Sequence, residues 1–158
     1  MIRDIRRNGA QPKDTMHKAG VALVTGMGVV IKDATTVEFP KAETVANIYV
    51  ATKERIPTGI NTARVDMSDY DEDFVKIAKG EFLGLERYTD GEKFATDQYK
   101  EADFTGEVAD GTPVSVGTDG KWQKLTTGSS KYVYEKPFKD NGHDLIMIRV
   151  EADAVAKA

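Results

Sequence analysis

The feature that most constrains the fold is a recurring two-residue turn signal. Asp90-Gly91, Asp110-Gly111, Asp119-Gly120 and Asn141-Gly142 each lie beside short runs rich in β-branched and aromatic residues. Such pairs favour tight turns between antiparallel strands, because glycine and asparagine tolerate positive φ. Turn signals spaced about every 10–20 residues, with short strands between them, are typical of all-β barrels and sandwiches.

The first half of the chain carries weaker strand patterns. Residues 21–25, 29–31 and 36–39 are short β-branched runs, and residues 45–52 alternate with Ile48 and Val50 on one face. Such alternation indicates a half-buried strand. Residues 66–79 fit a short helix capped by Ser68 as well as a strand, so both alternatives stay open.

The predicted fold class is therefore all-β. We expect a small barrel or sandwich, of β-tulip type, made of short antiparallel strands and hairpins, with at most one short helix. Residues 89–92 are predicted to join the runs 82–88 and 93–99 into a hairpin, and residues 151–158 are expected to fray. The 158 residues suffice for one domain with a single core.

The first 20 residues differ in charge from the rest. Arg3, Arg6, Arg7, Lys13 and Lys18 outnumber the two carboxylates of this stretch, whereas the whole chain has a formal charge of −4. Gly9, Pro12 and Gly20 also disfavour a helix here. We therefore expect residues 1–20 to form an extended basic arm, disordered in the free protein, on a single β-rich domain of residues 21–158.

Composition excludes several classes of protein. The chain has no cysteine, which excludes disulfide scaffolds, iron–sulfur proteins and thiol enzymes. No apolar run approaches the length of a membrane span, and the N-terminus lacks the apolar stretch of a signal peptide. We expect synthesis in a cytoplasm and no membrane contact.

No catalytic or cofactor motif is found, so we expect neither an enzyme nor a bound cofactor. His17 and His143 are far apart in the sequence, and His143 is expected to be exposed in a turn. Asp69, Asp71 and Asp73 match the start of a calcium loop, but Phe74 and Gly80 break the pattern. The Gly26-Met27-Gly28 fragment lacks the third glycine of a dinucleotide site.

The aromatic residues suggest two alternative binding functions. Tyr132, Tyr134 and Phe138 alternate with lysines as in single-strand nucleic-acid binders, but nearby carboxylates dilute the positive charge, so no nucleic-acid partner is expected. A carbohydrate-binding β-domain would instead stack a sugar on Trp122, Tyr88 or Tyr99.

Five segments together resemble the auxiliary head proteins of tailed bacteriophages, which decorate or cement the outside of the capsid. They are residues 56–61 (Ile-Pro-Thr-Gly-Ile-Asn), 69–74 (Asp-Tyr-Asp-Glu-Asp-Phe), 80–83 (Gly-Glu-Phe-Leu), 91–99 (Gly-Glu-Lys-Phe-Ala-Thr-Asp-Gln-Tyr) and 114–122 (Val-Ser-Val-Gly-Thr-Asp-Gly-Lys-Trp). The resemblance covers roughly residues 21–150 and consists of turn and strand patterns.

The resemblance implies a non-enzymatic β-domain that is made in the host cytoplasm, attaches to the outer capsid surface of the virion and stabilises it. Its partner would be the major capsid protein, and a homotrimer fits the symmetry of such lattices. The five cations of residues 1–20 named above are the expected capsid contacts, on the basis of charge and position alone. A head-fibre base, a tail protein and the carbohydrate-binding domain are the alternatives.

Overall fold

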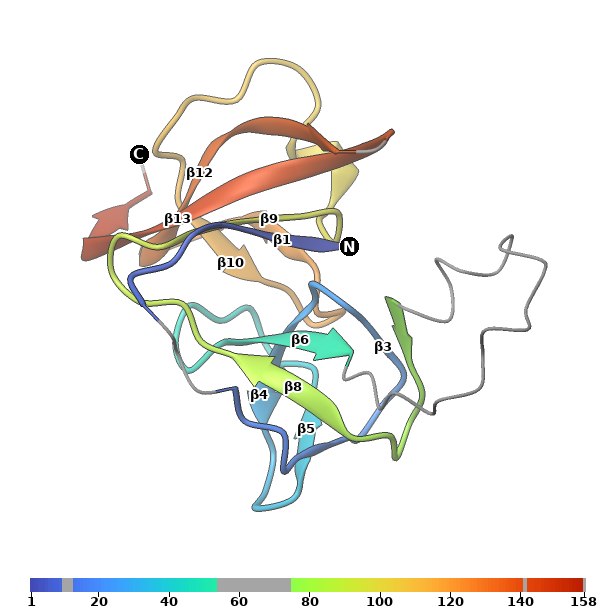
Figure 1. Ribbon diagram of the computed structural model, residues 1–158. Coiled ribbons are helices and arrows are strands. Elements are labelled where there is room, and N and C mark those ends of the chain that lie inside the picture. Colours follow the sequence, from blue (N-terminus) through green and yellow to red (C-terminus); the bar gives the residue numbers. More distant parts are fainter. Residues whose placement is uncertain (10–12, 54–74, 141, 158) are drawn as a thin grey trace.

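The computed structural model describes residues 1–9, 13–53, 75–140 and 142–157, and these residues are mostly strands (Figure 1). The strands are β1 (Ile2–Arg6), β2 (Lys18–Ala19), β3 (Leu23–Val24), β4 (Gly28–Ile31), β5 (Thr36–Glu38), β6 (Tyr49–Lys53), β7 (Lys76–Ile77), β8 (Leu83–Glu86), β9 (Lys93–Thr96), β10 (Val114–Val116), β11 (Trp122–Lys124), β12 (Ser129–Asp140) and β13 (His143–Ala156). A single helical turn, η2, spans Glu101–Asp103. The all-β prediction is confirmed.

A five-stranded sheet in the order β2-β5-β4-β6-β8 forms the lower half of the molecule in Figure 1. Strand β2 at one edge of the sheet, together with the residues just before it, contacts β8 and the residue before β8 at the other edge. The amide of Leu83 donates to the carbonyl of His17 (3.2 Å), and Asp14 and Leu85 exchange two backbone hydrogen bonds. We call this closed ring the lower barrel. Its core contains Ala19, Leu23, Val29, Val37, Ala51, Ile77, Leu83 and Leu85.

A second ring of strands forms the upper half. Strands β9, β13 and β12 are neighbours in one sheet, and β10 pairs with β11. Tyr134 on β12 donates its amide to the carbonyl of Thr112 just before β10 (2.8 Å), and Trp122 on β11 donates to Gln98 just after β9 (2.9 Å). These bonds close the upper barrel. Its core contains Ile48, Val50, Tyr88, Phe94, Val114, Val116, Trp122, Tyr132, Tyr134, Ile146, Ile148 and Val150.

The two barrels pack directly on each other through β4 and β6. Val50 belongs to the upper core and its neighbour Ala51 to the lower core, as the period of two along a strand requires. Gly28 on β4 lies against Val116 on β10, and its amide donates to the carbonyl of Gly120 (2.8 Å). The β4–β10 contact therefore depends on a residue without a side chain.

Substitution of Gly28 will test this contact. A Cβ at position 28 would lie 2.4 Å from Val116 Cγ2, so we expect Gly28→Ala to destabilise the fold by about 1–3 kcal/mol through overpacking. The cost should shrink in a Val116→Ala background, where space is available. Urea unfolding of the four proteins of this double-mutant cycle measures the difference. An equal cost in both backgrounds would contradict the role of Val116.

Two of the predicted turns are confirmed. The turn at Asp119 and Gly120 joins β10 to β11 in a hairpin with Val116 opposite Trp122, and Gly120 has a φ of 75°. The β12–β13 hairpin is closed at its tip by the pairing of Asp140 with His143. Strand β13 continues to Ala156, so the end of the chain pairs with β12 rather than fraying.

The predicted hairpin across residues 89–92 is wrong. Strand β8 pairs with β6 in the lower barrel, whereas β9 pairs with β1 and β13 in the upper half. The turn instead connects the two halves, because the Glu92 carboxylate binds the amide of Thr89 (2.7 Å) and Gly91 donates to Val150 (2.7 Å).

The structure also differs from the expected arm. Strand β1 pairs with β9, with a bulge between Asp4 and Arg6, and the chain from Asp14 to Ala19 completes the lower barrel. The physical reason is burial: Ile2 packs on the upper core and Ala19 lies within the lower core. Each barrel thus takes a strand from residues predicted to be free. Of the undecided stretch 66–79, only residues 75–79 are described; Val75 is helical and Lys76–Ile77 is a strand.

Candidate functional site

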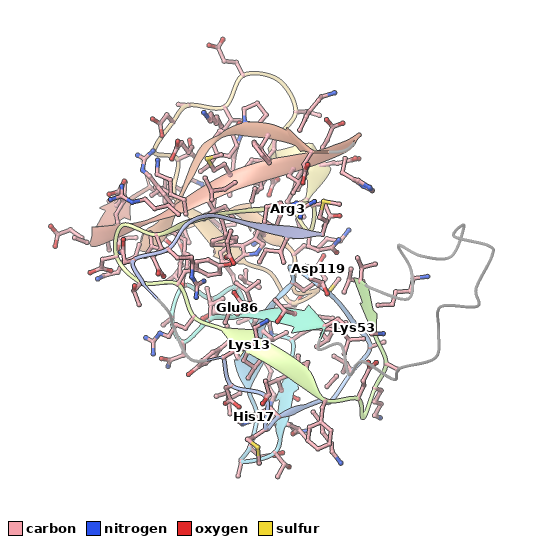
Figure 2. All side chains as sticks on the ribbon, viewed as in Figure 1. Arg3, Lys13, His17, Lys53, Glu86 and Asp119 are labelled. Atoms are coloured by element: carbon pink, nitrogen blue, oxygen red, sulfur yellow. The ribbon has the colours of Figure 1, made fainter. Side chains whose placement is uncertain are left out.

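The five cations expected to contact a capsid do not converge on one surface. Arg7 turns inward: its guanidinium lies 3.4 Å from Glu86 Oε2 and 3.6 Å from Glu92 Oε1, and 4.3 Å above the Tyr88 ring. Lys13 pairs with the same Glu86 (Nζ to Oε1, 2.9 Å), and Figure 2 shows these two side chains side by side. Arg7 and Lys13 are therefore engaged in the protein itself.

The other three cations are exposed and lie at opposite ends of the molecule. Arg3 and Arg6 lie on β1 in the upper half, where Arg3 forms an ion pair with Asp140 at the tip of β12. Among the described residues Arg6 has no ion-pair partner. Lys18 lies on β2 in the lower barrel, with its Nζ 4.7 Å above the Phe82 ring.

Exposed apolar side chains accompany Lys18. Phe82 is 49% exposed, and Met16, two residues before Lys18, is 75% exposed. Residues 82 and 18 face each other as a bridge between neighbouring segments, which places Met16, Lys18 and Phe82 on one side of the lower barrel. We call these three residues the lower apolar patch.

A groove lies in the upper half, between the distal end of the β12–β13 hairpin and the segment containing η2, drawn in yellow in Figure 1. Its volume is about 540 Å³, within the range of about 300–1,000 Å³ usual for ligand sites. Its lining consists of Tyr99, Glu101, Phe104, Thr105, Tyr134, Pro137, Phe138, Lys139, Asp144, Leu145 and Ile146. We call it the aromatic groove.

The local structure explains why these side chains meet. Tyr99 lies just after β9 and forms a bridge with Trp122 on β11. The single turn of η2 then reverses the chain, so that Phe104 packs against Tyr99. A bulge between Tyr134 and Lys136 changes the alternation of β12, so that Pro137 lies opposite Ile146. As a result, residues from three segments, 99–105, 134–139 and 144–146, line one concave surface.

Four aromatic side chains line the groove: Tyr99, Phe104, Phe138 and Tyr134, of which Tyr134 is only 4% exposed. The rings of Tyr99 and Phe104 are perpendicular with centroids 5.6 Å apart, and those of Phe104 and Tyr134 are tilted at 33° with centroids 5.4 Å apart. Both geometries are favourable arrangements of aromatic quadrupoles. The rings present faces in different directions rather than one flat platform.

Carboxylates lie in and beside the lining of the groove. Burial raises the pKa of Tyr99, and Asp144, Glu101 and Asp97 raise it further because their negative charges oppose ionisation of the phenol. Lys139 is the cation in the lining, and its Nζ pairs with Asp144 Oδ1 at 3.1 Å, both side chains being largely exposed. In the lining of the groove, the two carboxylates of Glu101 and Asp144 therefore outnumber the one ammonium group, that of Lys139.

Two of the three residues predicted to stack on a sugar are unavailable. Trp122 and Tyr88 are buried in the upper core, with 0% and 3% of their surface exposed. Only Tyr99 lines the groove. Of the aromatic and basic stretch around Tyr132, Tyr134 and Phe138, both tyrosines are buried in the upper core, Tyr134 also borders the groove, and Phe138 lines it half-buried.

The histidines and carboxylates do not assemble a metal centre within residues 1–9, 13–53, 75–140 and 142–157. His17 is buried beside Asp14, with 2.9 Å between Nδ1 and Oδ2, and His143 is half-buried at the start of β13. The calcium-like triplet Asp69, Asp71 and Asp73 lies outside the described residues. Across the same described ranges, no helix is both long and apolar enough for a membrane crossing.

Comparisons with known proteins return no relative. No family model, no curated protein and no solved structure matches the chain.

Proposed function

We propose that this chain is a virion structural protein that binds the outside of an assembled phage capsid and stabilises it. The proposal rests on the sequence resemblance to phage decoration proteins, together with one structural observation: the lower apolar patch. Met16 and Phe82 expose large apolar surfaces beside Lys18, in and next to the segment expected to contact the capsid. Apolar residues beside a cation are typical of protein interfaces.

The segments that carry the resemblance and are described have structural roles in both barrels. Residues 80–83 lead into β8, residues 91–99 contain β9, and residues 114–122 contain β10 and the turn to β11. The closed barrels also suit dense arrays of copies. Closure reduces the number of free strand edges, which would otherwise favour strand-to-strand association of crowded molecules. These features support a rigid domain repeated on a lattice.

The test is direct attachment. The purified protein is mixed with undecorated heads of the phage that encodes it, and the heads are imaged by cryo-electron microscopy. Density for a two-barrel domain at regular lattice points, with the lower apolar patch toward the shell, is the expected result. Bare shells at saturating protein would contradict the proposal and leave the fibre and tail alternatives.

Substitutions in the patch should weaken attachment without unfolding the protein. We expect Met16→Ser with Phe82→Ser to reduce occupancy of the shell about tenfold or more, because each apolar side chain contributes up to about 1.5–3 kcal/mol on full burial. Sedimentation of heads with bound protein measures occupancy. Ile5→Ser is the matched control, since Ile5 is 38% exposed on β1 in the other half. Equal loss in both variants would exclude the patch as the contact.

A further inference from the structure

The aromatic groove combines two features that select ligands. Its half-buried rings belong to Tyr99, Phe104 and Phe138, with Tyr99 and Phe104 perpendicular to each other. Carboxylates of Glu101 and Asp144 also lie in the lining. The face of an aromatic ring carries negative electrostatic potential and attracts cations that lose their water. The rings and the carboxylates therefore both favour a positively charged ligand.

The size of the groove indicates how the cation is presented. A volume of about 540 Å³ exceeds that of a single ammonium or guanidinium group. It accommodates a long side chain with part of the backbone that carries it. The groove lies beside the distal end of the β12–β13 hairpin, which supplies Phe138, Lys139 and Asp144 to its lining.

We propose that the aromatic groove binds a lysine or arginine side chain on an extended peptide segment of a partner protein. The cation lies against the rings of Tyr99 and Phe104, and Glu101 and Asp144 supply opposite charge at the rim. This site is separate from the lower apolar patch and does not depend on capsid attachment.

A neutral sugar is the competing ligand, and the ring arrangement disfavours it. Sugars stack their flat apolar faces on an exposed aromatic plane, whereas Tyr99 and Phe104 stand perpendicular to each other with an interplanar angle of 89°. Carboxylates accept hydrogen bonds from sugars, but a negative potential gives no advantage to an uncharged ligand. The two ligands therefore predict different responses to charge.

The experiment is a titration followed by the backbone amide signals in two-dimensional NMR. The probes are the capped tripeptides acetyl-Gly-Arg-Gly-amide and acetyl-Gly-Lys-Gly-amide, with acetyl-Gly-Gln-Gly-amide as the neutral control and maltotriose as the sugar. We expect both cationic peptides to shift the amides of Glu101, Phe104 and Asp144. Their dissociation constants should be on the order of 1 mM and at least about tenfold below that of the glutamine peptide.

Variants separate the contributions of charge and rings. Glu101→Gln with Asp144→Asn should weaken the cationic peptides about fivefold or more. Asp153→Asn makes the same kind of change on exposed β13 and should leave binding unchanged. Tyr99→Phe keeps the ring and should preserve cation binding, whereas Tyr99→Leu should reduce it. Lys139→Gln should tighten binding about twofold or more, a gain that misfolding cannot produce.

Each remaining outcome decides against the proposal. Equal shifts with the arginine and glutamine peptides would show that charge is not recognised. Binding of maltotriose without binding of the peptides would assign the groove to carbohydrate. If no probe shifts the amide signals at about 20 mM, which is 20-fold the expected dissociation constant, a cation site is excluded.

Discussion

Removal of residues 1–20 will abolish the cooperative unfolding of this protein. The truncation deletes β1, the segment that closes the lower barrel, and the buried Ala19. It leaves the edge of β8 unpaired and removes the amide of Asn8 that binds the buried Glu92. We expect a loss of more than about 5 kcal/mol, the lower end of the stability of a typical domain.

Thermal unfolding followed by circular dichroism measures this loss. The control keeps the backbone and removes the charge: Arg3, Arg6, Lys13 and Lys18 are all replaced by Gln. Exposed ion pairs contribute about 0–1 kcal/mol each, so this variant should keep a cooperative transition. A truncated protein that unfolds with the wild-type midpoint would show that residues 1–20 are a separate arm after all.

Replacement of Glu92 will have the second largest effect. Its carboxylate is fully buried and accepts the amides of Thr89 (2.7 Å) and Asn8 (2.9 Å), with the Arg7 guanidinium 3.6 Å away. Glu92→Ala leaves Arg7 and two amides without this acceptor at the junction of the barrels. We expect a loss of about 3–5 kcal/mol in urea unfolding at pH 7. Glu92→Gln keeps an oxygen acceptor and should cost less.

Acid supplies an independent check on Glu92. Burial alone would raise its pKa, but the amides of Asn8 and Thr89 and the charge of Arg7 outweigh burial and lower the pKa below its ordinary value of 4.5. A group with a lowered pKa stabilises the fold fully above the ordinary value, and this stabilisation is lost as pH falls through the lowered pKa. The stability gap between wild type and Glu92→Ala should therefore narrow below pH 4.5. A constant gap down to pH 2.5 would contradict this linkage.

The sequence predicts those parts of the fold that local chemistry determines. Asp119-Gly120 specifies a tight turn between two strands that pair with each other, and the structure has that hairpin. Ile48 and Val50 share one face of an alternating strand, and both belong to the upper core. The hairpin contacts lie within a few residues of the turn signal, and the alternation of Ile48 and Val50 is a property of their own segment.

Distant partners explain the parts that were not predicted. Asp90-Gly91 carries the same turn signal as Asp119-Gly120, but Glu92 binds Asn8 from the start of the chain and β9 finds its partners elsewhere. The basic residues of 1–20 looked like a solvated arm because Glu86, the partner of Arg7 and Lys13, lies far along the sequence.

The aromatic groove was visible in the sequence only in fragments. Tyr99 was a candidate for sugar stacking, and Tyr134 and Phe138 belonged to an aromatic and basic stretch. Phe104 carried no signal, since a lone phenylalanine after an acidic turn is unremarkable. The single turn of η2 and the bulge in β12 bring these residues together, and neither is encoded by a pattern that periodicity detects.

The distant contacts of β1 determine when this strand can dock during synthesis. Asp4 binds Tyr88 across 84 residues, and Arg3 pairs with Asp140 across 137 residues. A ribosome has therefore made most of the protein before β1 can dock, and the upper barrel can close only after β13 has emerged. Folds dominated by such distant pairings usually form in about milliseconds to seconds. Strand β1 is translated long before these partners, and until they have formed β9 lacks β1 at one of its edges.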